Sequence, residues 1–337
     1  MNGIKEKSFL LLILELWHKF TKKRKTHIIF LAILSSVSAL AELISIGMIF
    51  PFLAALTDPE LLLQNYYLES VLTFFNLEEK DFLSFITISF CIAILASVCF
   101  RVLVNYLLTR ISFSAGADIC KDIMQKVISQ PYTKHSEENS SEVIASIINK
   151  SNTVIYGVIV PVLMIMSSLT VLFLFIGALL AVSIKATFSI FAITILVYSV
   201  LVFFSNKKLQ SNSEIIAKNQ TLSVKTIQEA LGSIRNIILD GTGNFFHKRF
   251  SDADYITRYN QGTNMFIGAS PKYIVEGIGI IAIAVIAFIF VQSSYSETII
   301  PILGLYALAA QKLLPISQII YGSFTQISGS RESLIDI

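Results

Sequence analysis

Six long apolar runs separated by polar connections are the feature that most limits how this chain folds. They span approximately residues 27–56, 82–106, 154–182, 186–204, 273–291 and 299–321. A helix that crosses the hydrocarbon core of a bilayer needs about 20 mainly apolar residues, which is the length scale of these runs. Hydrophobic residues make up 54% of the chain and its mean hydropathy is +0.70, above the range of soluble domains. The sequence therefore predicts an all-α membrane protein with six transmembrane helices.

The distribution of lysine and arginine predicts how these helices are oriented. The short connections on one side contain only Lys80 and Lys185, whereas the opposite side holds most other basic residues, including the run at 22–25. Basic residues are enriched in the cytoplasmic loops of membrane proteins. We therefore expect a multi-pass protein of the inner (plasma) membrane with both termini in the cytoplasm.

The N-terminal residues predict a surface-lying segment, and the positions of cysteine and histidine limit the kinds of site that the membrane helices could hold. Residues 1–26 are expected to form a cytoplasmic amphipathic elbow segment, with a surface-lying helix at 8–20 and Trp17 as an interfacial anchor. The three cysteines form no disulfide framework, and all four histidines fall outside the predicted hydrocarbon core. No Ser/His/Asp arrangement falls within the predicted spans. The sequence thus indicates no intramembrane metal site, no intramembrane enzyme and no nucleic-acid partner.

Two connections on the predicted cytoplasmic side, at about 107–153 and 205–271, are far longer than the others. The second carries an apolar stripe with the three- and four-residue steps of one helix face, running from Val224 to Ile238 through Ile227, Leu231 and Ile234. Gly241 and Gly243 are expected to end that helix. Helical segments of about 25–30 residues would extend some 40 Å beyond the bilayer. Rigid cytoplasmic extensions are the favoured interpretation, and helices lying on the membrane surface are the alternative.

Local stretches in both long connections resemble the transmembrane domain of ABC exporters, as does the arrangement of spans and connections. Residues 228–237, followed by Asp240-Gly241 and 246–250, are similar to the segment after the second coupling helix of that family. Gln130-Pro131-Tyr132, with His135 and 139–144, resembles the first coupling loop.

Two further stretches resemble one branch of the family, the polysaccharide and lipid-linked oligosaccharide flippases. They are residues 305–309 with 313–315 on the sixth predicted helix, and Glu42 with Gly47 and Pro51 on the first. The resemblance covers nearly the whole chain. It implies an ATP-driven transporter that flips or exports an amphipathic substrate, a lipid-linked oligosaccharide or polysaccharide precursor.

The resemblance also implies partners. Such exporters work as dimers of two six-helix halves, here expected to be a homodimer in membrane lipid, and short coupling helices contact ATP-binding domains. By position, the coupling helices would lie at about 131–138 and 222–230. The residues expected to couple the chain to an ATP-binding domain are Pro131, Tyr132, His135, Leu222, Val224, Ile227 and Glu229. In the simpler interpretation, the apolar stripe at 224–238 packs extension helices against one another.

The sequence departs from the family pattern in one respect, since it contains neither a G-x-x-x-x-G-K-[ST] loop nor an ABC signature. Gly241-Thr242-Gly243 indicates helix termination, because Phe246 stands where a dinucleotide motif needs glycine or alanine. ATP and Mg²⁺ are therefore expected only on an ATP-binding domain outside this sequence, and no catalytic site is expected in the chain. The predicted organisation is an elbow (1–26), a transmembrane domain (27–327) and the start of a linker (328–337). The chain would be a piece of a longer protein or a half-transporter with a separate ATPase.

Charged residues inside apolar helices are the candidate substrate contacts, because each costs about 2.5–3.5 kcal/mol to insert. The candidates for the pathway are Glu42, Arg101, Gln311, Lys312 and Lys272. Their cations suit the pyrophosphate of a lipid-linked sugar. The alternative is that they form buried ion pairs that fix the helix register. For Lys272, four residues before Glu276, the pairing interpretation is favoured.

Other transporter classes remain open at the level of sequence. Within the family, an exporter of peptides or small molecules is the near alternative. An ion-coupled secondary transporter would use Glu42 as a proton carrier with Lys312 as its partner, but no pair of spans is interrupted at corresponding positions of two halves. A membrane scaffold without transport activity is the third possibility.

Overall fold

The computed structural model describes residues 17–18, 20–57, 82–133, 151–182, 184–292 and 299–335, and the regular elements in these ranges are all helical. Their order is α2 (Lys22–Gly47), α3 (Ile49–Thr57), α6 (Phe82–Ile128), α9 (Ser151–Val154), the π-helical turn η3 (Ile155–Ile159), α10 (Val160–Val182), α11 (Ile184–Gly232), α12 (Ile234–Asp240), α13 (Gly243–Gln292), α14 (Ile299–Gly329) and α15 (Arg331–Ile335). The all-α prediction is thus confirmed for the described part of the chain.

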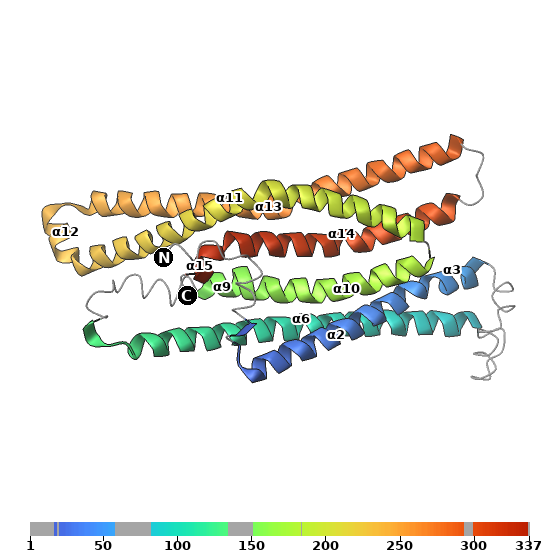
Figure 1. Cartoon of the computed structure of the whole chain (residues 1–337), viewed down its shortest axis with the longest axis horizontal. Coiled ribbons are helices and arrows are strands. Elements are labelled where there is room, and N and C mark those ends of the chain that lie inside the picture. Colours follow the sequence, from blue (N-terminus) through green and yellow to red (C-terminus); the bar gives the residue numbers. More distant parts are fainter. Residues whose placement is uncertain are drawn as a thin grey trace.

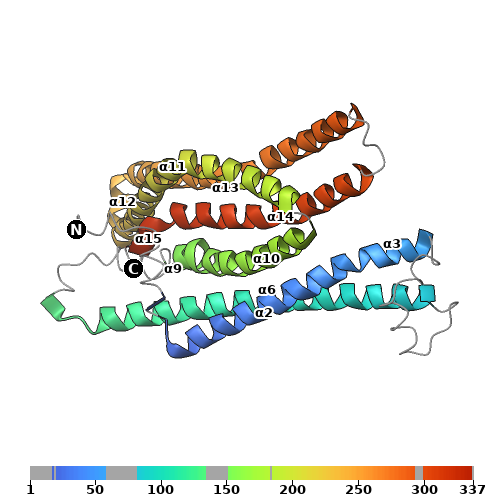
Figure 2. The same cartoon turned by 45° about the vertical axis from the view of Figure 1, so that its right-hand side comes forward.

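The long helices run side by side along one axis (Figures 1 and 2), with α2 against α6 and α11 against α13. Helices α6, α11 and α13 have 47, 49 and 50 residues, which corresponds to about 70–75 Å each. The hydrocarbon core of a bilayer is only about 30 Å thick. Each of these helices is therefore more than twice as long as a membrane crossing requires.

Three stretches within the described residues are long and apolar enough to cross a membrane by length and composition. They are Lys22–Gly47, Leu83–Ile128 and Ser151–Leu180. These helices identify a membrane protein. The number of six spans and the side on which the termini lie stay predictions.

Apolar side chains from α2, α6 and α10 form one core of the bundle. Ile28 and Leu31 of α2 pack with Val104 and Leu108 of α6, and Leu163 of α10 joins them. Arg24 lies beside Asp118 and Glu42 lies beside Arg101, so the two helices are antiparallel. A second core surrounds η3 and contains Ala115, Val154, Ile155, Val158, Ile159 and Ile327.

The π-helical turn lies where α10 approaches α14. Pro161 follows it and has no N–H to donate to the carbonyl of Gly157, which favours an irregular turn at this point. Gly157 is buried, and a Cβ placed there would lie only 2.6 Å from Cβ of Ser330. Only glycine therefore permits this approach of the two backbones.

The hairpin of α11 and α13 ends in the short helix α12, which Figure 1 shows at the end of the bundle. Helix α11 stops at Gly232, and Ser233 leaves the helical conformation with φ −113° and ψ 20°. Gly241 then adopts φ 66°, a left-handed conformation that favours glycine, and ends α12 as the sequence predicted. The predicted single helix through 224–238 is wrong in detail, because the chain bends between its two halves.

The apolar stripe on this segment faces outward. Ile227, Leu231, Ile234 and Ile238 are exposed by 44%, 66%, 48% and 71%. The interpretation that the stripe packs the extension helices of this chain against one another is therefore wrong. The amide–amide hydrogen bond from Asn212 to Asn264 (2.6 Å) joins α11 to α13 instead.

The beginning and end of the described chain are fixed to the bundle. Nε of Arg24 lies 2.6 Å from Oδ2 of Asp118, which joins α2 to α6. Asp118 lies beyond the apolar run that ends near residue 106, and the Arg24 guanidinium, by donating to its carboxylate, lowers the pKa of Asp118 below its usual value. At the other end, the backbone N–H of Glu332 donates to Oγ of Ser213 (3.0 Å). Residues 331–335, expected to begin a linker, thus form a helix held against α11. Most of the predicted elbow helix lies outside the described residues.

Candidate functional site

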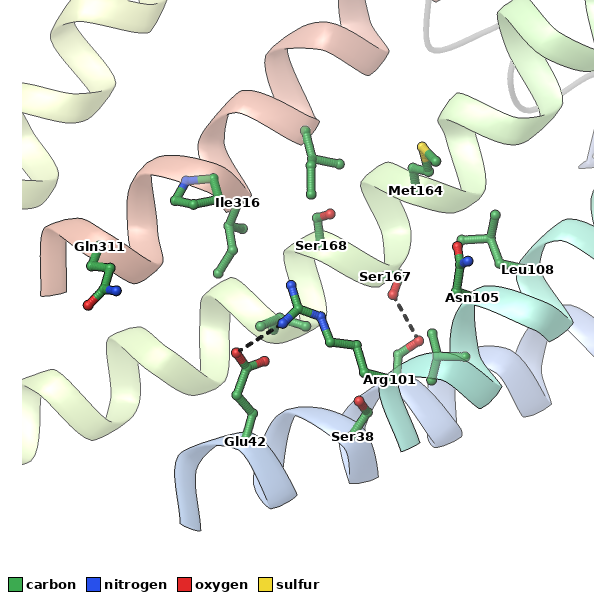
Figure 3. A pocket seen from close by; sticks show the side chains of 15 residues that line it. Ser38, Glu42, Arg101, Asn105, Leu108, Met164, Ser167, Ser168, Gln311 and Ile316 are labelled. Atoms are coloured by element: carbon green, nitrogen blue, oxygen red, sulfur yellow. Dashed lines mark hydrogen bonds and ion pairs between the residues drawn. The ribbon is translucent and has the colours of Figure 1, made fainter. Parts of the chain in front are cut away.

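A cavity of about 460 Å³ lies among α2, α6, α10 and α14, and we call it the four-helix cavity. It is lined by Ser35, Ser38, Glu42, Arg101, Val104, Asn105, Leu108, Met164, Ser167, Ser168, Val171, Gln311, Pro315, Ile316 and Ile319. Figure 3 shows polar side chains from all four helices gathered around it. A hollow with polar side chains among apolar helices is suited to holding a polar group.

Two predicted pathway residues meet in this cavity. Nη1 of Arg101 lies 3.8 Å from Oε1 of Glu42, the pair marked in Figure 3. The Arg101 side chain is 72% exposed, whereas that of Glu42 is 15% exposed. Both residues also line a neighbouring cavity of about 230 Å³, which places the pair at the boundary of the two hollows. At this separation the carboxylate holds the guanidinium loosely, so Arg101 retains donors for another anion.

Hydroxyl and amide groups complete the polar lining. Oγ of Ser35 and Oγ of Ser167 are 3.0 Å apart and join α2 to α10 (Figure 3). Ser38, Asn105 and Ser168 add polar groups to the same lining. Sequence reasoning missed these serines and the asparagine. Their helical spacing from the charged residues could have identified them. Positions 35, 38 and 42 share one face of α2, and positions 101 and 105 share one face of α6.

The other predicted pathway residues lie in different places. Gln311 lines the four-helix cavity. Lys312 is its neighbour in α14, and the Lys312 side chain falls outside the described part of the structure. Lys272 lies in α13 with an exposed side chain and does not line the cavity. Its part in a pathway therefore stays a prediction without support from this geometry.

The predicted coupling residues lie toward one end of the long helices. Pro131 and Tyr132 follow α6, and the Tyr132 side chain is 85% exposed. His135 lies outside the described residues. Leu222, Val224, Ile227 and Glu229 belong to the last turns of α11, not to a separate short helix. The separate short helix at the tip is α12.

Glu229 forms a structural contact between the helices of the hairpin. Its Oε2 accepts a hydrogen bond from Nη1 of Arg249 in α13 (2.8 Å), and its Oε1 lies 3.8 Å from Nζ of Lys225. This ion pair holds α11 and α13 together just before α12. Glu229 thereby stiffens the base of the tip.

A second cavity of about 700 Å³ adjoins the first across Met164, which lines both. Its walls come from the start of η3 and α10, from α13 around Asn264 and Gly268, and from the end of α14. Among the described residues that line it there is no lysine, arginine, aspartate or glutamate. The described linings of the two cavities therefore differ in chemistry, since the four-helix cavity carries an ion pair and the described lining of the second cavity is neutral.

The described lining of the four-helix cavity consists of hydroxyl, amide, charged and apolar side chains. In the described ranges no cluster of three or more histidine, cysteine, aspartate or glutamate side chains is placed to hold a metal ion. The arrangement of the four-helix cavity is suited to binding a polar or anionic group within apolar surroundings.

Comparison with known protein families adds the decisive finding. The sequence family described as the ABC transporter transmembrane region matches residues 26–299. The match begins near the start of α2 and reaches the start of α14, so it includes α2, α6, α10, α11 and α13, from which most of the fold is built. It spans well over half of the 337 residues. The chain therefore belongs to the family of ABC transporter transmembrane regions.

Proposed function

We propose that this chain is the membrane domain of an ATP-driven exporter or flippase whose substrate is a lipid-linked oligosaccharide or polysaccharide precursor. Members of the family generally pair with an ATP-binding domain and a second membrane half. In this proposal the chain crosses the membrane six times, keeps both termini in the cytoplasm and forms a homodimer. The observation that supports it most is a polar cavity in apolar helices, joined by long continuous helices to an exposed apolar tip.

The tip is suited to docking a soluble partner. Ile238 and Leu239 of α12 are 71% and 73% exposed, and Phe245 at the start of α13 is 63% exposed. Such side chains in water lose about 25 cal/mol of favourable free energy for every Å² of apolar surface left uncovered. A groove on an ATP-binding domain would cover them. We therefore place the second coupling helix at α12, a few residues after the 222–230 segment, and we place the first at Pro131 and Tyr132.

The hairpin that carries α12 is suited to transmitting force. Arg249–Glu229 and Asn212–Asn264 connect α11 to α13 at two levels. Asn212 is fully buried, so breaking its contact would leave polar groups without hydrogen bonds inside the bundle. Movement of the ATP-binding domain at α12 would thus move both helices together, and α14 with them, because α13 and α11 both pack on α14.

The four-helix cavity supplies groups that fit the proposed substrate. The exposed guanidinium of Arg101 is a planar donor that suits phosphate oxygens. Ser38, Asn105 and Gln311 present hydroxyl and amide groups that suit sugar hydroxyls. Glu42 would hold Arg101 between transport cycles and release it to the anion.

The test is ATP-dependent flipping by the full-length transporter, together with its ATP-binding domain, in proteoliposomes that contain a fluorescent lipid-linked oligosaccharide. We expect flipping that requires ATP and falls at least tenfold in Arg101→Gln. The matched control is Arg258→Gln, an exposed arginine on α13 paired with Asp254, which should flip at the wild-type rate. Flipping without ATP, or equal rates in both variants, would refute the proposal. If peptides stimulate ATP hydrolysis and lipid-linked oligosaccharides do not, the substrate would be a peptide, which would contradict the proposed substrate class.

A further inference from the structure

A further hollow, of about 360 Å³, lies between α2 and α6 and shares no lining residue with the three cavities described above. It is lined by Arg24, His27, Phe30, Leu107, Arg110, Ile111 and Ser114. None of these residues lines the four-helix cavity or the cavity around η3. We call it the basic pocket, because two arginines and a histidine line it and none of its described lining residues carries a carboxylate.

The two arginines of the basic pocket differ in how their charge is neutralised. Arg24 forms an ion pair with Asp118. Arg110 is exposed, its Nε lies 3.3 Å from the hydroxyl oxygen of Tyr106, and its guanidinium lies 5.5 Å from the centre of that ring. Within the described ranges, Arg110 forms no ion pair with a carboxylate. Its positive charge is therefore available to an anion, and the basic run Lys22–Lys25 adds to the potential nearby.

The surroundings of the basic pocket are apolar on the side toward the middle of the helices. Phe30 and Ile33 of α2 are 55% and 59% exposed, and Val102 and Leu103 of α6 are 64% and 44% exposed. Exposed apolar side chains on membrane-spanning helices suit contact with acyl chains, which removes their surface from water. Tyr106 and Arg110 together have the composition of a membrane interface, where an aromatic ring and a cation lie at headgroup level.

We propose that the basic pocket binds the phosphate of an anionic phospholipid from the leaflet next to the basic end of α2. Arg110 would donate to the phosphate, with His27 and Ser114 as further polar contacts, and the acyl chains would lie against the apolar side chains of α2 and α6. Basic pockets between transmembrane helices are suited to such headgroups. A free phosphate ion would use the same donors but would gain nothing from Phe30 and its neighbours.

The experiment measures thermal unfolding of the full-length protein in detergent while short-chain phosphatidylglycerol is added. Short-chain phosphatidylcholine and inorganic phosphate are titrated in parallel. A cation near a membrane surface contributes to lipid binding by an amount equivalent to about a fivefold change in affinity. We therefore expect phosphatidylglycerol to stabilise the wild type at about fivefold lower concentration than Arg110→Gln. Arg110→Lys should recover part of the loss, and Arg258→Gln should match the wild type.

The outcomes separate the possible occupants. Equal half-saturation in wild type and Arg110→Gln, or equal effects of the two lipids, would overturn the proposal. An equal effect of inorganic phosphate would assign the pocket to a soluble anion and overturn the lipid. If Arg110→Gln is too unstable to measure, Ser114→Leu fills the pocket without changing charge and should abolish the preference for phosphatidylglycerol. Retention of that preference in Ser114→Leu would refute the site.

Discussion

Gly157→Ala is the substitution for which the structure makes the sharpest stability prediction. The added Cβ would lie 2.6 Å from Cβ of Ser330 and would also overlap the Ser330 hydroxyl. A Cβ atom is fixed by its backbone, so rotation of the serine cannot relieve the clash, and the junction of α14 and α15 must move. Overpacking of this kind costs about 1–3 kcal/mol, and the fixed position of both atoms favours the upper half of that range. At about 2.1 cal/mol/K per residue, the unfolding entropy of the 337 residues is about 0.7 kcal/mol/K, so the midpoint of thermal unfolding should fall by roughly 3–4 °C.

Two further variants isolate this contact. Gly262→Ala is the matched control, since Gly262 lies inside α13 with nothing within 4 Å of its added Cβ. Alanine there should leave the midpoint unchanged or raise it, because alanine favours a helix over glycine by up to about 1 kcal/mol. Ser330→Gly combined with Gly157→Ala should restore most of the lost stability. The close approach of η3 and α14 would be refuted if Gly157→Ala had the same midpoint of thermal unfolding as Gly262→Ala. It would also be refuted if Ser330→Gly failed to restore the stability of Gly157→Ala.

Two other substitutions test the ends of the long helices. Asp118→Asn should lower the free energy of unfolding by about 1 kcal/mol or less, since the pair with Arg24 is partly exposed. The folded-state pKa of Asp118 lies below its ordinary value of 3.8, so the contribution of the pair is present above that value and is lost as pH falls through the folded pKa. The difference in melting temperature from wild type should therefore be constant between pH 6 and pH 8, and a difference that changes over this range would contradict the assignment. Ile238→Asp at the 71% exposed tip should leave folding intact but uncouple ATP hydrolysis from transport in the full-length transporter. Unchanged coupling in Ile238→Asp would refute the docking of α12.

Much of the fold could be predicted because membrane helices obey a simple constraint, namely that apolar runs must form internally hydrogen-bonded helices. Gly241 could be predicted as a helix end because its left-handed conformation favours glycine. The bend at Gly232–Ser233 could not, since a serine leaves the helix there without a sequence signal as strong as proline. The periodicity of the stripe predicted an apolar face correctly, but periodicity does not say whether the same chain or a partner covers that face.

Some residues of the candidate site could be predicted from the sequence, and others could not. Glu42 and Arg101 could be predicted because charge inside an apolar run is conspicuous, and the structure brings them together at 3.8 Å. Ser35 and Ser167 are far apart in sequence, and small hydroxyls are common in membrane helices, so their contact depends on how α2 crosses α10. The π-helical turn at η3 also depends on tertiary contacts, here with α14, and Pro161 alone did not reveal it.

The most direct test of the central claim asks whether ATP moves access to the four-helix cavity from one side of the membrane to the other. Ser38 lines the cavity and is 8% exposed, and Ser38→Cys changes one atom. The variant is made in a full-length transporter whose other cysteines, including Cys91, Cys99 and Cys120, are replaced by serine. Labelling by a membrane-impermeant maleimide is then measured from each side. The account predicts labelling from the cytoplasmic side without nucleotide and from the opposite side with ATP and vanadate. Labelling rates that do not respond to ATP would contradict it.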